Sequence, residues 1–202
     1  VAGLDDPVID INVTPNKQDC LGVRGIARDL AAAGMGTLKP LDATPVQGTY
    51  DSPINVQLNF EAGYEDACGC FLGRHFRGLK NGPAPEWLRR RLLAIGLRPI
   101  SALVDMTNYV THDLGRPLHV FDAGKVSGDI QARMATPGEG FQALDGKDYE
   151  LDGEITVIAD QTAAEAIGGV MGGEASGCTD GTTEMFLEAA LFNAHRTAAT
   201  GR

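Results

Sequence analysis

Residues 141–151, FQALDGKDYEL, decide the fold class of this chain because they contain its clearest hairpin signal. Two short runs, residues 141–144 and 149–151, flank Asp145-Gly146, a dipeptide typical of a tight turn between antiparallel strands. Other apolar runs of strand length lie on both sides of this hairpin, at residues 130–134, 155–159, 164–167 and 185–191. The second half of the chain is therefore predicted to consist mainly of strands.

Helical patterns lie before this region. One helix is predicted to begin at Pro85 and to end at Gly96, with an apolar stripe of Leu88, Leu92 and Ile95. Two strands and a second helix are predicted from similar patterns, at residues 54–60, 68–76 and 103–114. Since helices cluster early and strands late, we predict an α+β fold with mixed or antiparallel sheets and a few helices.

The N-terminal part has a pattern of its own. Apolar and polar residues alternate over residues 8–13, which predicts a strand, and Asp19 suits the N-cap of a helix that ends near Gly34. Residues 40–53 contain three prolines and have the composition of a linker. We therefore predict a short strand-helix element over residues 1–45 and a separate domain over residues 46–202.

Composition restricts the class of protein. Of the 202 residues, 43% are hydrophobic and 22% are charged, which is typical of a soluble globular protein rather than a disordered one. The sequence has no apolar run near the ~20 residues of a membrane-spanning helix and no signal segment at its start. Since it begins at Val1 without an initiator Met, we expect it to be part of a longer protein.

Charge argues against a domain that binds nucleic acid mainly through phosphates. The 17 Lys and Arg residues against 27 Asp and Glu residues give a net charge of -10, whereas such a domain is usually basic. Seven basic residues lie between Arg74 and Arg98, and twelve acidic residues lie between Gly138 and Glu188. Any RNA contact is therefore expected to be local, and two solvated faces of opposite charge are the alternative.

The four cysteines are too few for a disulfide scaffold, and their spacing matches no zinc motif. We predict that Cys20, Cys68, Cys70 and Cys178 are buried or half-buried thiols in a reducing cytoplasm. Neither a metal nor a cofactor is expected in this part of the protein.

Three features could carry chemistry. Residues 168–173 contain four glycines, which allow close approach to a ligand and offer backbone N–H groups, although a glycine-rich hairpin is an alternative. His119 lies between apolar residues and could be catalytic or simply structural. Glu188 lies in an apolar strand, where a buried carboxylate needs a partner, unless the strand is an edge strand with Glu188 facing water. The sequence contains no nucleophile elbow, zincin motif or Walker loop.

Four segments carry a family resemblance: residues 85–88 (PEWL), 104–110 (VDMTNYV), 115–122 (GRPLHVFD) and 168–177 (GGVMGGEASG). In this order and spacing they resemble the editing domain, formed by the third and fourth modules, of the beta chain of bacterial phenylalanyl-tRNA synthetases. Residues 8–20 (VIDINVTPNKQDC) resemble the segment just upstream, which returns to the first module. The resemblance extends to about Arg196 and assigns residues 46–202 to the editing domain, truncated at its C-terminal end.

The resemblance implies hydrolysis of the ester of tyrosine mischarged on tRNA(Phe). His119 is then the catalytic residue, which positions water or the tRNA end. Substrate-binding roles fall to the positions that match the family's site, namely Arg98 near the terminal nucleotide, Thr107 and Asn108 on a helix that walls the site, Gly172 beside the amino acid, and Glu188 at the tyrosine hydroxyl.

The resemblance also implies a larger assembly. The parent enzyme ligates phenylalanine to tRNA(Phe) with ATP and Mg, in the cytoplasm, through an alpha chain with which the beta chain forms an alpha2-beta2 heterotetramer. The 3′ end of tRNA(Phe) is the expected partner of this domain, and no membrane partner is expected. Two other interpretations stay open: a non-catalytic assembly module of the same synthetase, and a free-standing hydrolase that acts on mischarged tRNA in trans.

Overall fold

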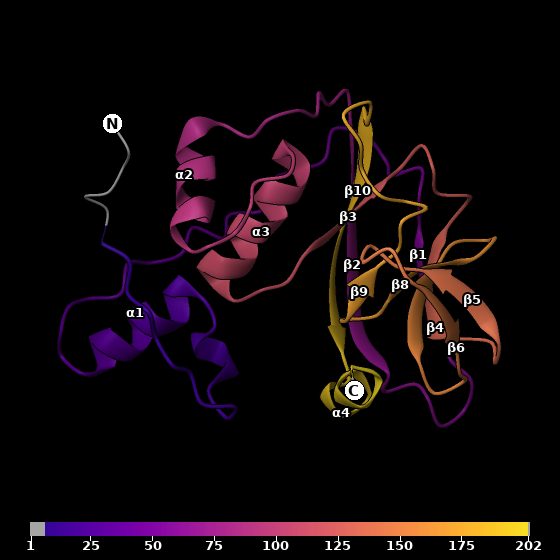
Figure 1. Ribbon diagram of the computed structural model, residues 1–202, viewed down its shortest axis with the longest axis horizontal. Coiled ribbons are helices and arrows are strands. Elements are labelled where there is room, and N and C mark those ends of the chain that lie inside the picture. Colours follow the sequence, from indigo (N-terminus) through magenta and orange to yellow (C-terminus); the bar gives the residue numbers. More distant parts are fainter. Residues whose placement is uncertain (1–6, 202) are drawn as a thin grey trace. The chain divides into compact units, whose positions relative to one another are not determined.

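The computed structural model describes residues 7–201, and the chain forms two compact units (Figure 1). The first unit consists of Val1–Asp51 and Gly82–Pro117, and the second of Ser52–Asn81 and Leu118–Arg202. The first unit therefore joins the N-terminal region to a helical segment that lies beyond residue 45 in the sequence. The division into modules at residues 1–45 and 46–202 stays a prediction, because compact units and family modules need not coincide.

Helices make up the regular structure described in the first unit: a 3-10 turn η1 (Gln18–Cys20), α1 (Val23–Ala32), α2 (Glu86–Ala94) and α3 (Ala102–Leu114). Helices α2 and α3 pack through Leu88 and Leu92, which are buried against Leu97, Ala102 and Tyr109. Both helices were predicted. They end where Gly96 (φ 81°) and Gly115 (φ 68°) adopt the left-handed conformation that glycine tolerates best.

Two predictions for the N-terminal region are wrong. Residues 8–13 form no strand, and Val8 and Ile9 stay exposed, because alternation alone does not supply the partner strand that an extended segment needs. Helix α1 has Gly22 as its N-cap, not Asp19, whose carboxylate instead bonds Arg28 on α1. The predicted end of this helix is confirmed, since Gly34 has a φ of 78° and donates its N–H to Ala31 O at 3.0 Å.

The predicted α+β class is confirmed by the second unit, which contains three sheets and the C-terminal helix α4 (Ala194–Thr200). A five-stranded mixed sheet has the order β1-β4-β7-β8-β9, and in sequence order its strands span Val56–Leu58, Ile130–Met134, Thr156–Ala159, Ala164–Ile167 and Met171–Gly172. A three-stranded antiparallel sheet has the order β2-β10-β3, with bounds Cys68–Arg77, Glu184–Phe192 and His119–Asp122. The predicted hairpin forms the third sheet, β5 (Glu139–Gln142) and β6 (Asp148–Leu151).

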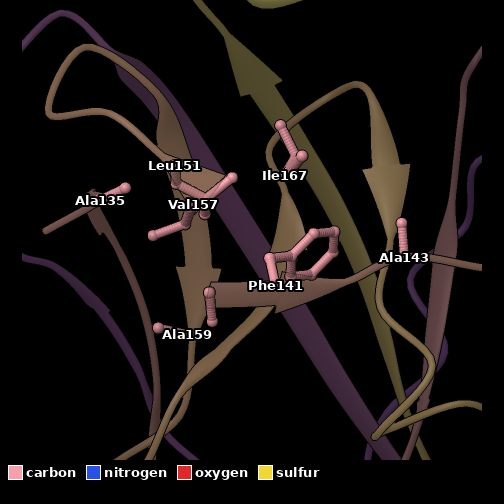
Figure 2. Packing of buried hydrophobic residues seen from close by; sticks show 8 residues of the cluster. Ala135, Phe141, Ala143, Leu151, Val157, Ala159 and Ile167 are labelled. Atoms are coloured by element: carbon pink, nitrogen blue, oxygen red, sulfur yellow. The ribbon is translucent and has the colours of Figure 1, made fainter. Parts of the chain in front are cut away.

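The five-stranded sheet is covered on both faces. One face packs on the three-stranded sheet through a cluster of Ile54, Phe121, Ile130, Ile158, Ala166 and Phe186. The other face packs on the β5–β6 hairpin through a second cluster, which includes Phe141, Leu151, Val157 and Ile167 (Figure 2). All four residues of β7, with the sequence TVIA, are buried. Burial on both faces of the sheet explains why the three residues after Thr156 are all apolar and do not alternate with polar ones.

Other differences from the sequence-based expectations are local. Strand β1 is shorter than predicted, and Pro85 is the N-cap of α2 rather than its first residue, with Ile95 exposed after its last turn. All four cysteines are free thiols, but Cys70 is exposed, contrary to the prediction that all four are at least half-buried. In the described residues, no helix has both the length and the apolar character that a membrane crossing requires.

The packing of the two sheets gives a first testable prediction. Phe186 is 1% exposed and lies in the cluster that joins them, so Phe186→Ala should lower the free energy of unfolding by about 3–5 kcal/mol. Leu191, on the same strand β10, is 55% exposed. Leu191→Ala should therefore change the free energy of unfolding by less than about 0.5 kcal/mol. Urea unfolding of both variants measures the difference. Equal losses would contradict this account of the core.

Candidate functional site

The antiparallel pairing of β10 with β3 places Glu188 directly opposite His119. Directly paired residues of antiparallel strands point to the same face, with Cβ atoms about 4.5–5.5 Å apart. The next pair on that face is Phe186 and Phe121, which belong to the core between the two sheets. Two polar side chains therefore continue the face that the aromatic core residues occupy.

His119 is half-buried and lies against both an aromatic ring and a glycine. Its ring meets that of Phe121 edge to face, with 4.5 Å between centroids and 78° between planes. A Cβ added at Gly172 would lie 2.5 Å from His119 Cε1, so the imidazole occupies the space that a side chain at position 172 would need. Burial lowers the pKa of His119 to about 4, because the charged imidazolium loses hydration there. The imidazole is therefore neutral at physiological pH.

Glu188 is buried, at 7% exposure, on the central strand of its sheet. The interpretation of Glu188 as a solvent-facing residue of an edge strand is therefore wrong. The pKa of the Cys68 thiol on β2 is raised, first by burial of the thiol and further by the negative charge of Glu188. The lone carboxylate in an apolar strand was thus a correct signal for a buried acidic group.

The glycine-rich segment forms the β8–β9 hairpin, in which Ala166 pairs with Gly172. Gly169 has a φ of 71° at the turn. The N–H groups of Gly168 and Gly173 are not available to a ligand, because they donate to Thr156 O and Glu165 O, each at 2.8 Å. The glycines of this segment therefore allow His119 to lie close to Gly172. The backbone N–H donors that the sequence suggested are largely engaged within the sheet.

The six predicted site residues fall into two groups. The second unit brings His119, Gly172 and Glu188 together, whereas Arg98, Thr107 and Asn108 belong to the first unit. Arg98 is exposed in the loop between α2 and α3, and Asn108 is half-buried on α3. Thr107 is buried, and its hydroxyl donates to Val104 O at 2.8 Å within the same helix. The Thr107 hydroxyl is therefore already engaged.

Sequence reasoning missed two buried polar residues beside the glycine-rich segment. Glu165, on β8, is 4% exposed, and Ser176, just after β9, is 1% exposed. Burial raises the pKa of Glu165, and the negative charge of Asp160 adds to this effect, whereas the nearby Ser176 hydroxyl lowers it. Glu165 has the same signal as Glu188, a single carboxylate within an apolar strand, and could have been found by it.

Within residues 7–201, one group of side chains has the geometry of potential metal ligands, namely Asp19, Cys20 and Asp29 in the first unit. These carboxylates already have cationic partners. Lys17 Nζ lies 3.1 Å from Asp29 Oδ2, and Arg28 bonds both Asp19 and Asp29. Hydrogen bonds from Arg28 and Lys17 lower the pKa of Asp29 to about 2. The cluster is an ion-pair network on the surface of the first unit.

Comparisons with known proteins point to one family. The family model of the B3/4 domain matches residues 67–202, more than half of the chain. A phenylalanine–tRNA ligase beta subunit from Paramagnetospirillum magneticum is 61% identical over 197 residues, covering 98% of this chain and 25% of that protein. One from Bradyrhizobium diazoefficiens is 55% identical over 203 residues, covering 100% and 25%. The chain thus spans about a quarter of the length of these curated relatives.

A solved structure supports the same assignment at the level of the fold. It is the crystal structure of an N-terminal fragment of the phenylalanyl-tRNA synthetase beta subunit from Pyrococcus horikoshii, which aligns with a TM-score of 0.54 over 90% of this chain and 54% of that chain. At 14% sequence identity this likeness concerns the fold alone. The chain therefore belongs to the B3/4 domain family, and along nearly its whole length it is similar to the beta subunits of phenylalanine–tRNA ligases.

Proposed function

We propose that this chain is the editing domain of a phenylalanyl-tRNA synthetase and that it hydrolyses the ester of tyrosine mischarged on tRNA(Phe). The observation that carries the proposal is the pairing of buried Glu188 with neutral His119, beside Gly172, in a chain of the B3/4 domain family. This arrangement offers one acceptor for a hydroxyl group and one neutral hydrogen-bonding group for water.

The chemical problem favours a second site that binds the hydroxyl. Tyrosine differs from phenylalanine by one hydroxyl group, and an apolar synthetic site rejects an added hydroxyl by only about a hundredfold. In the editing site, Glu188 accepts a hydrogen bond from the phenol of tyrosine. A phenylalanine side chain cannot form that bond, which contributes roughly 1–3 kcal/mol to binding. Discrimination here therefore comes from binding the wrong amino acid, not from excluding it.

Hydrolysis needs no protein nucleophile, because the aminoacyl ester is already activated. Water attacks the carbonyl carbon, and the bond from that carbon to the ribose oxygen breaks. The products are free tyrosine and the tRNA with its terminal hydroxyl restored. A neutral imidazole both accepts and donates a hydrogen bond, so His119 can orient the water while the ribose hydroxyl shares in proton transfer. A pKa near 4 makes His119 a weak general base at neutral pH.

The other predicted site residues take supporting roles in this proposal. Arg98, exposed in its loop, is assigned to the terminal nucleotide. Asn108 offers a side-chain amide, whereas the hydroxyl of Thr107 is already bonded to Val104 O. The parent enzyme uses ATP and Mg in its alpha chain, which joins the beta chain in an alpha2-beta2 heterotetramer in the cytoplasm.

Glu188 provides the most specific test of hydroxyl recognition. In the complete enzyme, Glu188→Ala should slow single-turnover hydrolysis of Tyr-tRNA(Phe) by about 10- to 100-fold, because the lost acceptor is worth roughly 1–3 kcal/mol. Phenylalanine ligation should change less than about twofold. Glu150→Ala, which removes an exposed strand glutamate on β6, is the matched control. Unchanged hydrolysis in Glu188→Ala would show that Glu188 does not bind the tyrosine hydroxyl.

His119 tests the role of the imidazole. A pKa lowered to about 4 means that the imidazole is unprotonated throughout pH 6–8, so its protonation state does not change in that range. We expect His119→Ala to slow hydrolysis of Tyr-tRNA(Phe) by less than about a hundredfold and to leave the pH dependence from 6 to 8 unchanged, since a general base is worth ~10²–10⁴-fold. A thousandfold loss, together with a titration near pH 6.5 that disappears in the variant, would identify His119 as the base instead.

A further inference from the structure

Two buried polar side chains lie side by side next to the proposed site without a normal hydrogen bond. Among residues 7–201, neither Oε2 of Glu165 nor Oγ of Ser176 has a hydrogen-bond partner of normal geometry. The two groups are nevertheless close enough for the Ser176 hydroxyl to lower the pKa of the Glu165 carboxyl. An unsatisfied buried polar group is costly, because it loses its bonds to water without gaining others, so two such neighbours call for an explanation.

The main chain around these residues shows what they could hold in place. Gly173 N donates to Glu165 O at 2.8 Å, which ties the glycine-rich segment to β8. Three residues later, Ser176 O accepts from Asp122 N at 2.8 Å, which ties the same segment to β3, the strand of His119. Residues 172–177 therefore connect the five-stranded sheet to the strand that carries the imidazole.

We propose that Glu165 and Ser176 form a side-chain hydrogen bond that fixes residues 172–177 and so holds Gly172 against His119. Glu165 and Ser176 are positioning residues in this inference, because neither contacts the reacting atoms. The inference deepens the proposed function and rests on it for its consequence in catalysis.

Three observations support this pairing. Both side chains are more than nine-tenths buried, so water cannot readily satisfy them. Burial raises the pKa of the Glu165 carboxyl and the Ser176 hydroxyl lowers it, as expected of a hydroxyl that donates to the carboxyl. A Cβ at Gly173 would lie 2.7 Å from Glu165 O, so the segment already approaches β8 as closely as its main chain allows. The side-chain bond would secure that approach.

The test combines amide exchange and kinetics in the complete protein. Glu165→Leu removes the hydrogen bond at similar size, Glu165→Gln keeps a side chain that can bond the hydroxyl, and Ser176→Ala removes the other partner. We expect amide hydrogen exchange of residues 172–177 to be at least about fivefold faster in Glu165→Leu and in Ser176→Ala, and close to wild type in Glu165→Gln. Thr156→Val, which alters a buried hydroxyl on β7, is the matched control and should leave this segment unchanged.

Single-turnover hydrolysis of Tyr-tRNA(Phe) supplies the second readout. Glu165→Leu should lower the maximal rate more than it weakens tRNA binding, and Glu165→Gln should restore that rate, because Gly172 and His119 act on the reacting group rather than on affinity. Adding Ser176→Ala to Glu165→Leu should cause little further loss if the two residues share one bond.

The outcomes separate this inference from the proposed function. Unchanged exchange of residues 172–177 in Ser176→Ala and in Glu165→Leu overturns the inference, even if the wild-type enzyme hydrolyses Tyr-tRNA(Phe). Equal defects in Glu165→Gln and Glu165→Leu overturn the hydrogen bond between the side chains. If wild-type enzyme lacks hydrolysis, the proposed function fails, while the exchange data still decide whether the bond exists. If Glu165→Leu does not fold, Ser176→Ala alone provides the decision.

Discussion

The pairing of β10 between β2 and β3 is the constraint on which both the core and the candidate site of the second unit depend. In this register, Phe186 lies opposite Phe121 and packs between the sheets, and two residues later Glu188 lies opposite His119. Because side chains alternate along a strand, a slip of one residue would move both the aromatic and the polar side chains to the other face. The apolar packing that stabilises the sheet therefore also sets the geometry of the polar pair.

Burial gives these polar groups their chemical character. It keeps the imidazole of His119 neutral near Phe121 and Gly172, and it raises the pKa of Glu165 on the neighbouring sheet. A water molecule or a phenolic hydroxyl that enters such surroundings meets hydrogen-bonding groups with few competing solvent molecules, so each bond counts for more than it would at the surface. In the proposed editing reaction, the low exposure to water that makes these groups costly to bury also makes their hydrogen bonds selective.

Local sequence patterns correctly predicted the elements with a strong periodicity. They failed to predict elements whose structure depends on partners far along the chain. Strands β4 and β8 have the predicted bounds, and the Asp145-Gly146 turn lies in the predicted hairpin. Strand β3 was missed, because His119–Asp122 follows Pro117 and becomes a strand only through its pairing with β10.

At the candidate site, family motifs pointed to His119 and Glu188. Local patterns could not reveal that the hairpin N–H groups are engaged or that Glu165 lies beside Ser176, since both facts depend on how the strands and the following loop meet in the folded chain.

Substitution of Gly172 tests most directly whether His119 and the β8–β9 hairpin enclose the reacting aminoacyl group. Gly172 does not have a positive φ, so Gly172→Ala is compatible with the backbone and acts by pushing away the imidazole, at 2.5 Å, and Leu144 Cδ1, at 2.9 Å. Gly140→Ala is the control, because a Cβ there meets nothing within 4 Å. In single-turnover hydrolysis of Tyr-tRNA(Phe) by the complete enzyme, the account predicts that Gly172→Ala loses most of the activity, while Gly140→Ala and phenylalanine ligation are unaffected. Wild-type hydrolysis by Gly172→Ala would contradict the account.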